Sequence, residues 1–321
     1  MKKVVLAVLV LLVLALGGLV AYVAMMDWNQ HKAEIANQIS ELTGKKVVLQ
    51  GNISMSILPS PTLSAENVLL YNNEGDYSTK PLAEIKKVEA KVSLGVLFSN
   101  SFDVQRIALK EPKLVFEVDK ARRLNWMGAK KTEAADADKE EVDIALDSVT
   151  FEKATVRFIE QNSGIDTTLE NLNAEVIAQT VTGPYRIEGS YTKGDQPEGF
   201  AVSLGKIVDG MATSVNFVVN YPATKSYVRF DGTVFLENSN VLGSAVIESE
   251  QPATWVNSLQ DEVTIEPDYN QPLAVSADIN TNVSKIDLSN VVLKYGKTSG
   301  AGNVLIPLLT PEMKEQKQHP K

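Results

Sequence analysis

From Val47 to Ile306 the chain repeatedly alternates apolar and polar residues, and this period of two constrains the fold more than any other feature. Successive side chains of a β-strand point to opposite faces of the sheet, so the alternation predicts strands with one apolar and one polar face. Val47 to Ile57 shows the pattern first and predicts one strand, which Pro59 and Pro61 end. Val88 to Leu94 repeats it. The chain is therefore predicted to be mainly β.

About sixteen such segments follow one another at a spacing of about 4.8 Å, which predicts a long antiparallel sheet roughly 75 Å across. Turn-type residues separate them, as at Asn162-Ser163-Gly164 and Gly296-Lys297. Too few helices are predicted to cover the apolar side of so long a sheet. It can close on itself as a sandwich or barrel, or curl into an open groove, shaped like a taco, that holds an apolar ligand. We predict the curled groove.

The first 26 residues predict a membrane anchor. Lys2 and Lys3 precede an apolar run, Val4 to Met26, that contains no charged side chain. A helix of that length rises roughly 35 Å and exceeds the hydrocarbon core of about 30 Å. The two lysines predict a cytoplasmic N-terminus, with the body of the protein on the far side of the membrane. The alternative, a cleavable signal peptide, normally has a shorter apolar run and a small-x-small exit.

The order of patterns predicts five parts. After the transmembrane signal anchor (residues 1–26) comes a domain of residues 27–127, which begins with a short amphipathic helix over Asp27 to Thr43 and continues as sheet. Residues 128–141 contain no large apolar side chain and predict a polar linker. Residues 142–309 are predicted to continue the repeated β pattern, and residues 310–321 to form a polar tail.

Composition excludes several kinds of chemistry. The chain contains no cysteine, and its two histidines, His31 and His319, lie far apart in the sequence. A net charge of −9 argues against a nucleic-acid partner, because phosphate binding needs a concentrated basic surface. The acidic segment Asp136 to Glu141 lacks the central glycine of a calcium loop. No nucleophile, phosphate-loop or zinc-protease motif occurs. We expect no catalytic residue, no metal site and no cofactor.

Several short motifs occur in a characteristic order. The helix runs into Leu42-Thr43-Gly44-Lys45-Lys46-Val47, Pro59-Ser60-Pro61 follows, and Leu124-Asn125-Trp126 closes the region. This order resembles the N-terminal region of the AsmA family of Gram-negative envelope proteins. The resemblance implies a single-pass anchor in the bacterial inner membrane and a periplasmic body with an elongated, hydrophobic-lined β-groove. It also implies a part in phospholipid movement toward the outer membrane, and it brings no catalytic residues with it.

The leading hypothesis is a non-enzymatic protein that holds lipid acyl chains along the apolar face while headgroups stay at the polar rim. Its partners are membrane phospholipids and an envelope protein that completes a bridge. The candidate lining residues are apolar positions of the predicted strands, namely Val47, Leu49, Ile53, Met55, Val88, Val92, Leu94, Leu114 and Phe116. The alternative is a structural or interaction protein that affects outer-membrane protein assembly through a partner, without bound lipid. An envelope hydrolase needs an acid/base pair that no pattern marks.

Overall fold

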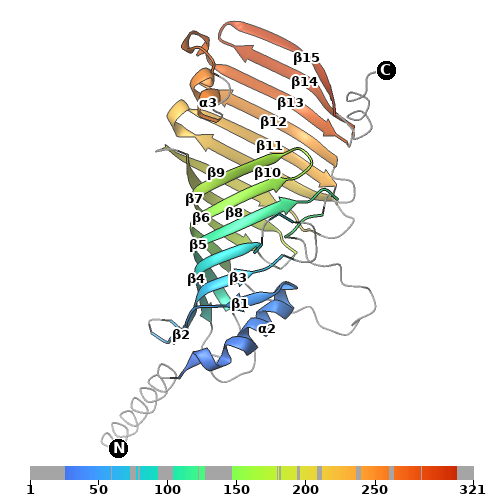
Figure 1. Ribbon diagram of the computed structural model, residues 1–321. Coiled ribbons are helices and arrows are strands. Elements are labelled where there is room, and N and C mark those ends of the chain that lie inside the picture. The colour runs from blue at the N-terminus through green and yellow to red at the C-terminus, as the bar shows by residue number, and fades with distance from the viewer. Residues whose placement is uncertain are drawn as a thin grey trace, which may run out of the picture. The chain divides into compact units, whose positions relative to one another are not determined.

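The computed structural model describes residues 26–58, 60–72, 77–78, 80–92, 104–121, 123–126, 147–178, 180, 182–193, 196–207, 212–235, 240–259, 264–282 and 284–308 (Figure 1). The predicted linker and polar tail lie outside these ranges, as does all of the predicted anchor except Met26. Within these ranges, no helix has the length and apolar character needed to cross a bilayer. The anchor and the linker therefore stay predictions.

The chain is mainly β, as the alternation predicts. Its helices are the 3₁₀ turns η1 (Trp28–His31), η3 (Pro222–Thr224) and η4 (Pro267–Tyr269) and the α-helices α2 (Lys32–Thr43) and α3 (Pro252–Leu259). The first group of strands is β1 (Val47–Leu49), β2 (Ile53–Ser56), β3 (Thr62–Leu70), β4 (Ala83–Val92), β5 (Val104–Val118), β6 (Ser148–Glu160) and β7 (Ile165–Ala178). The second group is β8 (Tyr185–Lys193), β9 (Gln196–Leu204), β10 (Ala212–Tyr221), β11 (Ser226–Phe235), β12 (Asn240–Ser249), β13 (Leu273–Thr281), β14 (Lys285–Tyr295) and β15 (Thr298–Pro307).

The described strands belong to one 15-stranded sheet in which neighbours in sequence are mostly neighbours in space, and β2 pairs with β3 beside β1. The strand pairings that the structure describes are antiparallel except for that of β5 and β6, which run parallel, with Arg106 opposite Ser148 and Val118 opposite Glu160. The sheet is therefore mostly antiparallel, as predicted, and this pair is the departure from that prediction. Parallel neighbours need a connection of a dozen or more residues, and the segment between Val118 and Ser148, which contains the predicted linker, supplies it.

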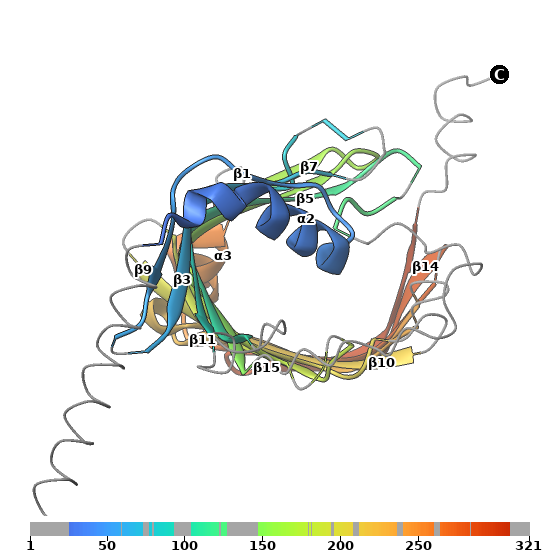
Figure 2. The ribbon, with the colours of Figure 1, turned by 90° about the horizontal axis from the view of Figure 1, so that it is seen from below.

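The chain divides into two compact units, Met1–Asn173 and Ala174–Lys321, and the division falls within β7. In unit 1 the predicted amphipathic helix forms as η1 and α2, and Gly44 ends it in the left-handed conformation with φ 64°. Figure 2 shows α2 lying alongside β1. The helix contributes Ile35, Ala36 and Ile39 to a hydrophobic core on the sheet beneath it.

The strand predicted over Val47 to Ile57 forms as two pieces, β1 and β2, which both pair with β3. Gly51 lies between them, and its amide donates to the carbonyl of Glu66 at 2.9 Å. A Cβ on Gly51 would lie 2.6 Å from the carbonyl oxygen of Glu66, so the backbones approach more closely than a side chain permits. The alternation does not register this break, because the apolar side chains on either side of it stay buried.

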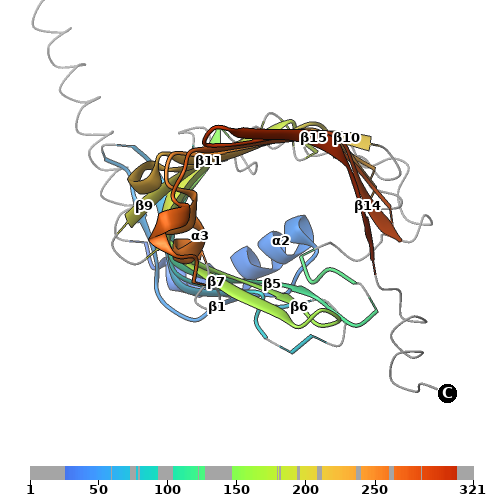
Figure 3. The same ribbon diagram turned by 90° about the horizontal axis from the view of Figure 1, so that it is seen from above.

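Unit 2 contains the C-terminal part of β7 and an antiparallel series from β8 to β15. Figure 3 shows α3 beside the ends of these strands, close to β9. The indole of Trp255 on α3 contacts the ring of Tyr221 on β10, with ring centroids 5.4 Å apart. The face of the sheet that carries Tyr221 is therefore the face that α3 partly covers.

Candidate functional site

One face of unit 2 is apolar over eight consecutive strands, β8 to β15. Cross-strand pairing aligns its side chains into rows that run across the sheet. One row contains Phe200, Val219, Val228, Ile247, Val275 and Leu293. A second contains Ile187, Val202, Phe217, Phe230, Ala245 and Ala277. A third contains Leu204, Val215, Gly232, Gly243, Ile279, Leu288 and Val304. We call this surface the apolar face of unit 2.

This face is not the inside of a closed core. Of the residues in these three rows only Phe230 is buried, and most of the others are half-buried. Leu293 and Val304 near the last strand are 43% and 45% exposed. The described elements of unit 2 outside the sheet are α3 and the short turns η3 and η4, and η4 contacts the sheet through a hydrogen bond from the Tyr295 hydroxyl on β14 to the carbonyl of Tyr269. Contiguous apolar surfaces of this extent generally mark places where another apolar partner binds.

Two glycines shape the middle of the apolar face. Gly232 and Gly243 are cross-strand partners, and a Cβ on either would lie 2.5 Å or 2.8 Å from Cζ of Phe230. The Phe230 ring therefore lies over the glycine pair, and Phe217 stacks on it with centroids 5.6 Å apart. Any side chain at these two positions would displace that ring.

The opposite face of unit 2 is largely polar. It carries charged, amide and hydroxyl side chains at the intervening positions, among them Arg186, Glu188, Asn216, Arg229, Asp231 and Ser244. The sheet of unit 2 thus has one apolar and one polar surface, as the alternation predicts.

The predicted lining residues occupy a different environment in unit 1. Val47, Leu49 and Ile53 are buried together in the core under α2, and Val88 and Leu114 pack against that core. Met55 and Val92 form a second small cluster with Ile57. Phe116 is half-buried and meets the Trp126 ring edge-on at 5.4 Å, and Leu94 lies outside the described residues. Their role in lining a lipid groove stays a prediction, and the structure gives the two clusters a packing role.

A buried polar network holds the end of β5 in unit 1. The side chain of Asn125 is fully buried; its Oδ1 accepts from the amide of Glu117 at 2.8 Å, and its Nδ2 donates to the carbonyl of Val115 at 2.8 Å. Lys45 donates from Nζ to the carbonyl of Asn125 at 2.9 Å, and burial lowers the pKa of this lysine. The carboxylate of Glu117 accepts from the amide and hydroxyl of Ser78, each at 2.7 Å. Two of the motifs that carry the family resemblance, around Lys45 and Asn125, therefore meet in this network.

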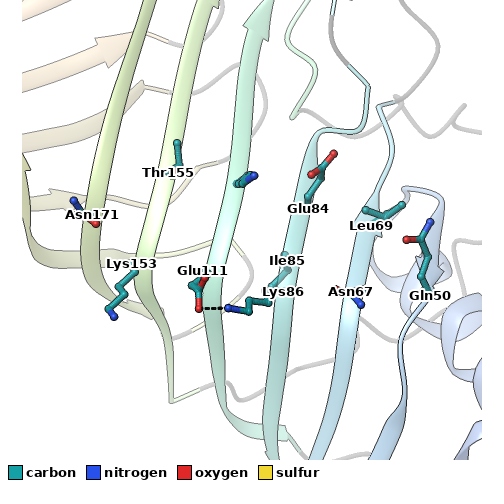
Figure 4. A pocket seen from close by; sticks show the side chains of 11 residues that line it. Gln50, Asn67, Leu69, Glu84, Ile85, Lys86, Glu111, Lys153, Thr155 and Asn171 are labelled. Carbon is teal, nitrogen blue, oxygen red and sulfur yellow. Dashed lines mark hydrogen bonds and ion pairs between the residues drawn. The ribbon is translucent and has the colours of Figure 1, made fainter.

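A polar hollow of about 500 Å³ lies on the other side of the unit 1 sheet from α2 (Figure 4). Its lining consists of Gln50, Asn67, Leu69, Glu84, Ile85, Lys86, Glu111, Lys113, Lys153, Thr155 and Asn171. Lys86 and Glu111 form an ion pair across it at 2.6 Å, and the hydrogen bond from Lys86 lowers the pKa of Glu111. Lysines and carboxylates both line the hollow, so it does not select one sign of ligand charge.

Four residues that line this hollow have left-handed backbone conformations, with φ of 49° at Asn67, 47° at Glu111, 52° at Lys153 and 52° at Asn171. The register of β3 against β4 does not shift at Asn67, since Glu66 faces Lys87 and Val68 faces Ile85. The four residues lie on β3, β5, β6 and β7, so left-handed residues recur on the strands that line the hollow.

Neither the apolar face of unit 2 nor the polar hollow of unit 1 brings described side chains together in an arrangement typical of catalysis. Among the described residues no group of three or more His, Asp or Glu side chains could hold a metal ion. His31 lies 3.6 Å from Glu34 on the exposed side of the N-terminal helix, one turn away. The interaction that these surfaces offer is the binding of a ligand that carries apolar groups beside polar ones.

These features define an open, mainly β protein with an apolar sheet face. The AsmA family model matches residues 1–298, which is most of the chain, and the protein therefore belongs to the AsmA family. Membership supports a general role of the envelope or lipid-transport type. No curated protein and no solved structure shows a significant match to the chain.

Sequence reasoning placed every candidate lining residue before the predicted linker and missed the apolar face of unit 2. The signal was present, because the same alternation continues through β10, β11 and β12. The first strands are the ones that α2 covers.

Proposed function

We propose that this protein is a non-enzymatic, inner-membrane-anchored envelope protein that holds lipid acyl chains on the apolar face of unit 2 and contributes to phospholipid transport. The observation that carries the proposal is the extent of that face without a covering layer in the described part of unit 2. Each methylene removed from water contributes about 0.8 kcal/mol, so one acyl chain gains several kcal/mol along such a surface. Membership of the AsmA family supports the same function.

Movement of lipid along this face requires no chemical step. The rows present similar apolar side chains on successive strands, so neighbouring positions have similar affinity for an acyl chain. A chain can then pass between rows without leaving an apolar environment. Polar side chains on the opposite face keep the sheet soluble in water.

Photo-crosslinking tests the proposal. The full chain in detergent is incubated with a phospholipid that carries a diazirine on one acyl chain, and crosslinked peptides are mapped by mass spectrometry. We expect crosslinks in β10 to β13. Val219→Glu places a charge on the apolar face and is expected to lower these crosslinks at least fivefold. The matched change Val218→Glu, on the same strand but the opposite face, is expected to leave them within twofold.

Two results would contradict the proposal: crosslinks confined to residues 1–26, or an equal loss in both variants with the fold intact by circular dichroism.

One observation favours the alternative, an interaction protein without lipid. Every residue of β15 is exposed and none of them is charged, so this edge strand lacks the usual protection against pairing with another strand. A stoichiometric protein partner together with absent lipid crosslinks would favour that alternative.

A further inference from the structure

One end of the apolar face carries a buried carboxylate with an unused oxygen. Glu198 on β9 is 5% exposed, and its Oε2 has no hydrogen-bond partner. Tyr191, its cross-strand neighbour on β8, hydrogen-bonds to the Glu198 side chain, and burial together with this bond raises the pKa of the tyrosine. A buried carboxylate oxygen without a donor is costly, and such a group in a native protein calls for an explanation, of which a bound ligand is one.

Aromatic rings and an unused donor lie beside this carboxylate. The hydroxyl groups of Tyr191 and Tyr221 are hydrogen-bonded to each other, and the Tyr221 ring contacts that of Trp255 on α3. Trp255 is 6% exposed, and its Nε1–H also has no hydrogen-bond partner. Phe200 adds a further ring 6.3 Å from Tyr191. The cluster thus contains one unsatisfied acceptor and one unsatisfied donor, connected by two tyrosines.

These groups complement a headgroup that carries both charges. A carboxylate among aromatic rings attracts an ammonium group through its charge and through the negative ring faces. An indole N–H donates to an anionic oxygen and has no acceptor function of its own. A zwitterionic phospholipid presents an ammonium and a phosphate a few bonds apart, and its acyl chains are the ligands already proposed for the adjoining row.

The position of the cluster fits that orientation. Glu198 and Phe200 lie on the same face of β9, two residues apart, and Phe200 belongs to the row that contains Val219, Val228 and Ile247. Tyr191 and Tyr221 are partly exposed, whereas Glu198 and Trp255 are buried. A headgroup in contact with the tyrosines would therefore place its acyl chains on the apolar face.

We propose that Glu198, Tyr191, Tyr221 and Trp255 form a site for the headgroup of an amine-bearing zwitterionic phospholipid. The site deepens the proposed lipid-holding function and rests on it. Glu198 accepts from the ammonium, and the indole of Trp255 donates to the phosphate. Phospholipids whose headgroup lacks the ammonium keep the contact between phosphate and Trp255 but lose the contact with Glu198, and they therefore bind more weakly.

Competition between two probes tests the site. Diazirine phosphatidylethanolamine and diazirine phosphatidylglycerol with identical acyl chains are offered to the full chain in equal amounts, and crosslinks to β9–β13 are counted for each. We expect the wild-type protein to prefer the ethanolamine lipid at least fivefold. Glu198→Gln keeps the size and shape of the side chain and is expected to bring the ratio close to one. Glu188→Gln, an exposed change on the opposite face, is expected to leave the ratio unchanged.

The outcomes separate this inference from the general function. A wild-type ratio near one, with abundant crosslinks, overturns the headgroup site and leaves the lipid-holding function standing. Absence of crosslinks from both lipids overturns the function itself. A preference that survives in folded Glu198→Gln also overturns the site. If Glu198→Gln does not fold, the wild-type ratio still tests the headgroup site. Trp255→Phe provides a second test, because loss of the indole donor is expected to weaken the binding of both lipids equally.

Discussion

At the scale of single residues, the motifs that identify the family act in packing. Thr43-Gly44-Lys45 ends the helix with a left-handed glycine and sends Lys45 into the interior, where it meets the carbonyl of Asn125. Asn125 in turn satisfies backbone groups of β5 on both sides of Phe116. Lys45 and Asn125 are separated by 80 positions in the chain. Their contact holds the segment that leads into β1 against the end of β5.

Removal of the Asn125 side chain tests this assignment. Asn125→Ala leaves the amide of Glu117 and the carbonyl of Val115 without their buried partners, and each such group costs about 1–3 kcal/mol. We expect the free energy of unfolding to fall by roughly 2–4 kcal/mol in urea titrations followed by circular dichroism. Asn162→Ala, at an exposed turn, is expected to change it by less than about 0.5 kcal/mol. Equal losses in the two variants would refute a special role for Asn125.

At the scale of elements, α2 decides which apolar surface is closed. Ile35 and Ile39 of this helix cover the cluster that contains Val47, Leu49 and Val68. In unit 2 the only α-helix among the described residues is α3, and it is eight residues long. Two parts of the sheet with the same alternation therefore present a covered face in one unit and a largely uncovered face in the other.

Truncation of the helix side chains measures what this cover contributes. Ile39→Ala removes apolar contacts to the unit 1 core, and because Ile39 is half-buried we expect a loss of about 1–3 kcal/mol, in the lower part of the usual range for core truncations. Gln38→Ala, an exposed neighbour on the same helix, serves as the control and is expected to be neutral. Thermal and urea unfolding give the comparison. A neutral Ile39→Ala would show that α2 contributes little to the stability of unit 1.

The limits of prediction from sequence also lie at this scale. The period of two predicted the mainly β fold and the two chemically distinct faces of unit 2, because burial on one side of a strand selects apolar residues directly. It could not show whether that side meets a helix or remains open, because both environments select aliphatic side chains. Leu49 under α2 and Val219 on the apolar face of unit 2 follow the same alternation. The pattern also missed the parallel pairing of β5 and β6, since a strand carries no local mark of its partner's direction.

At the scale of the whole molecule, the carboxyl groups with lowered pKa values are distributed unequally between the units. Six carboxyl groups among the described residues have pKa values below their ordinary range, and all six belong to unit 1, namely Asp27, Glu89, Glu111, Asp119, Glu160 and Asp166. Hydrogen bonds from Lys87 and Lys110 lower the pKa of Glu89, and a hydrogen bond from Arg157 lowers that of Asp166. When the carboxylates of Glu89 and Asp166 gain protons, they lose their negative charge and these charged hydrogen bonds are lost.

The two units are therefore expected to respond differently to acid. A carboxyl group whose pKa is lower in the folded state stabilises that state fully above its unfolded pKa, here 3.8 for aspartate and 4.5 for glutamate. This stabilisation is lost as the pH falls through the folded pKa. Between pH 7 and pH 3 the urea midpoint of unit 1 should fall more than that of unit 2.

The three tryptophans allow separate readouts, because Trp28 and Trp126 lie in unit 1 and Trp255 lies in unit 2. Fluorescence of Trp255→Phe reports unit 1, and that of the double variant Trp28→Phe/Trp126→Phe reports unit 2. Equal shifts, or a larger shift for unit 2, would show that these ion pairs do not control the acid response.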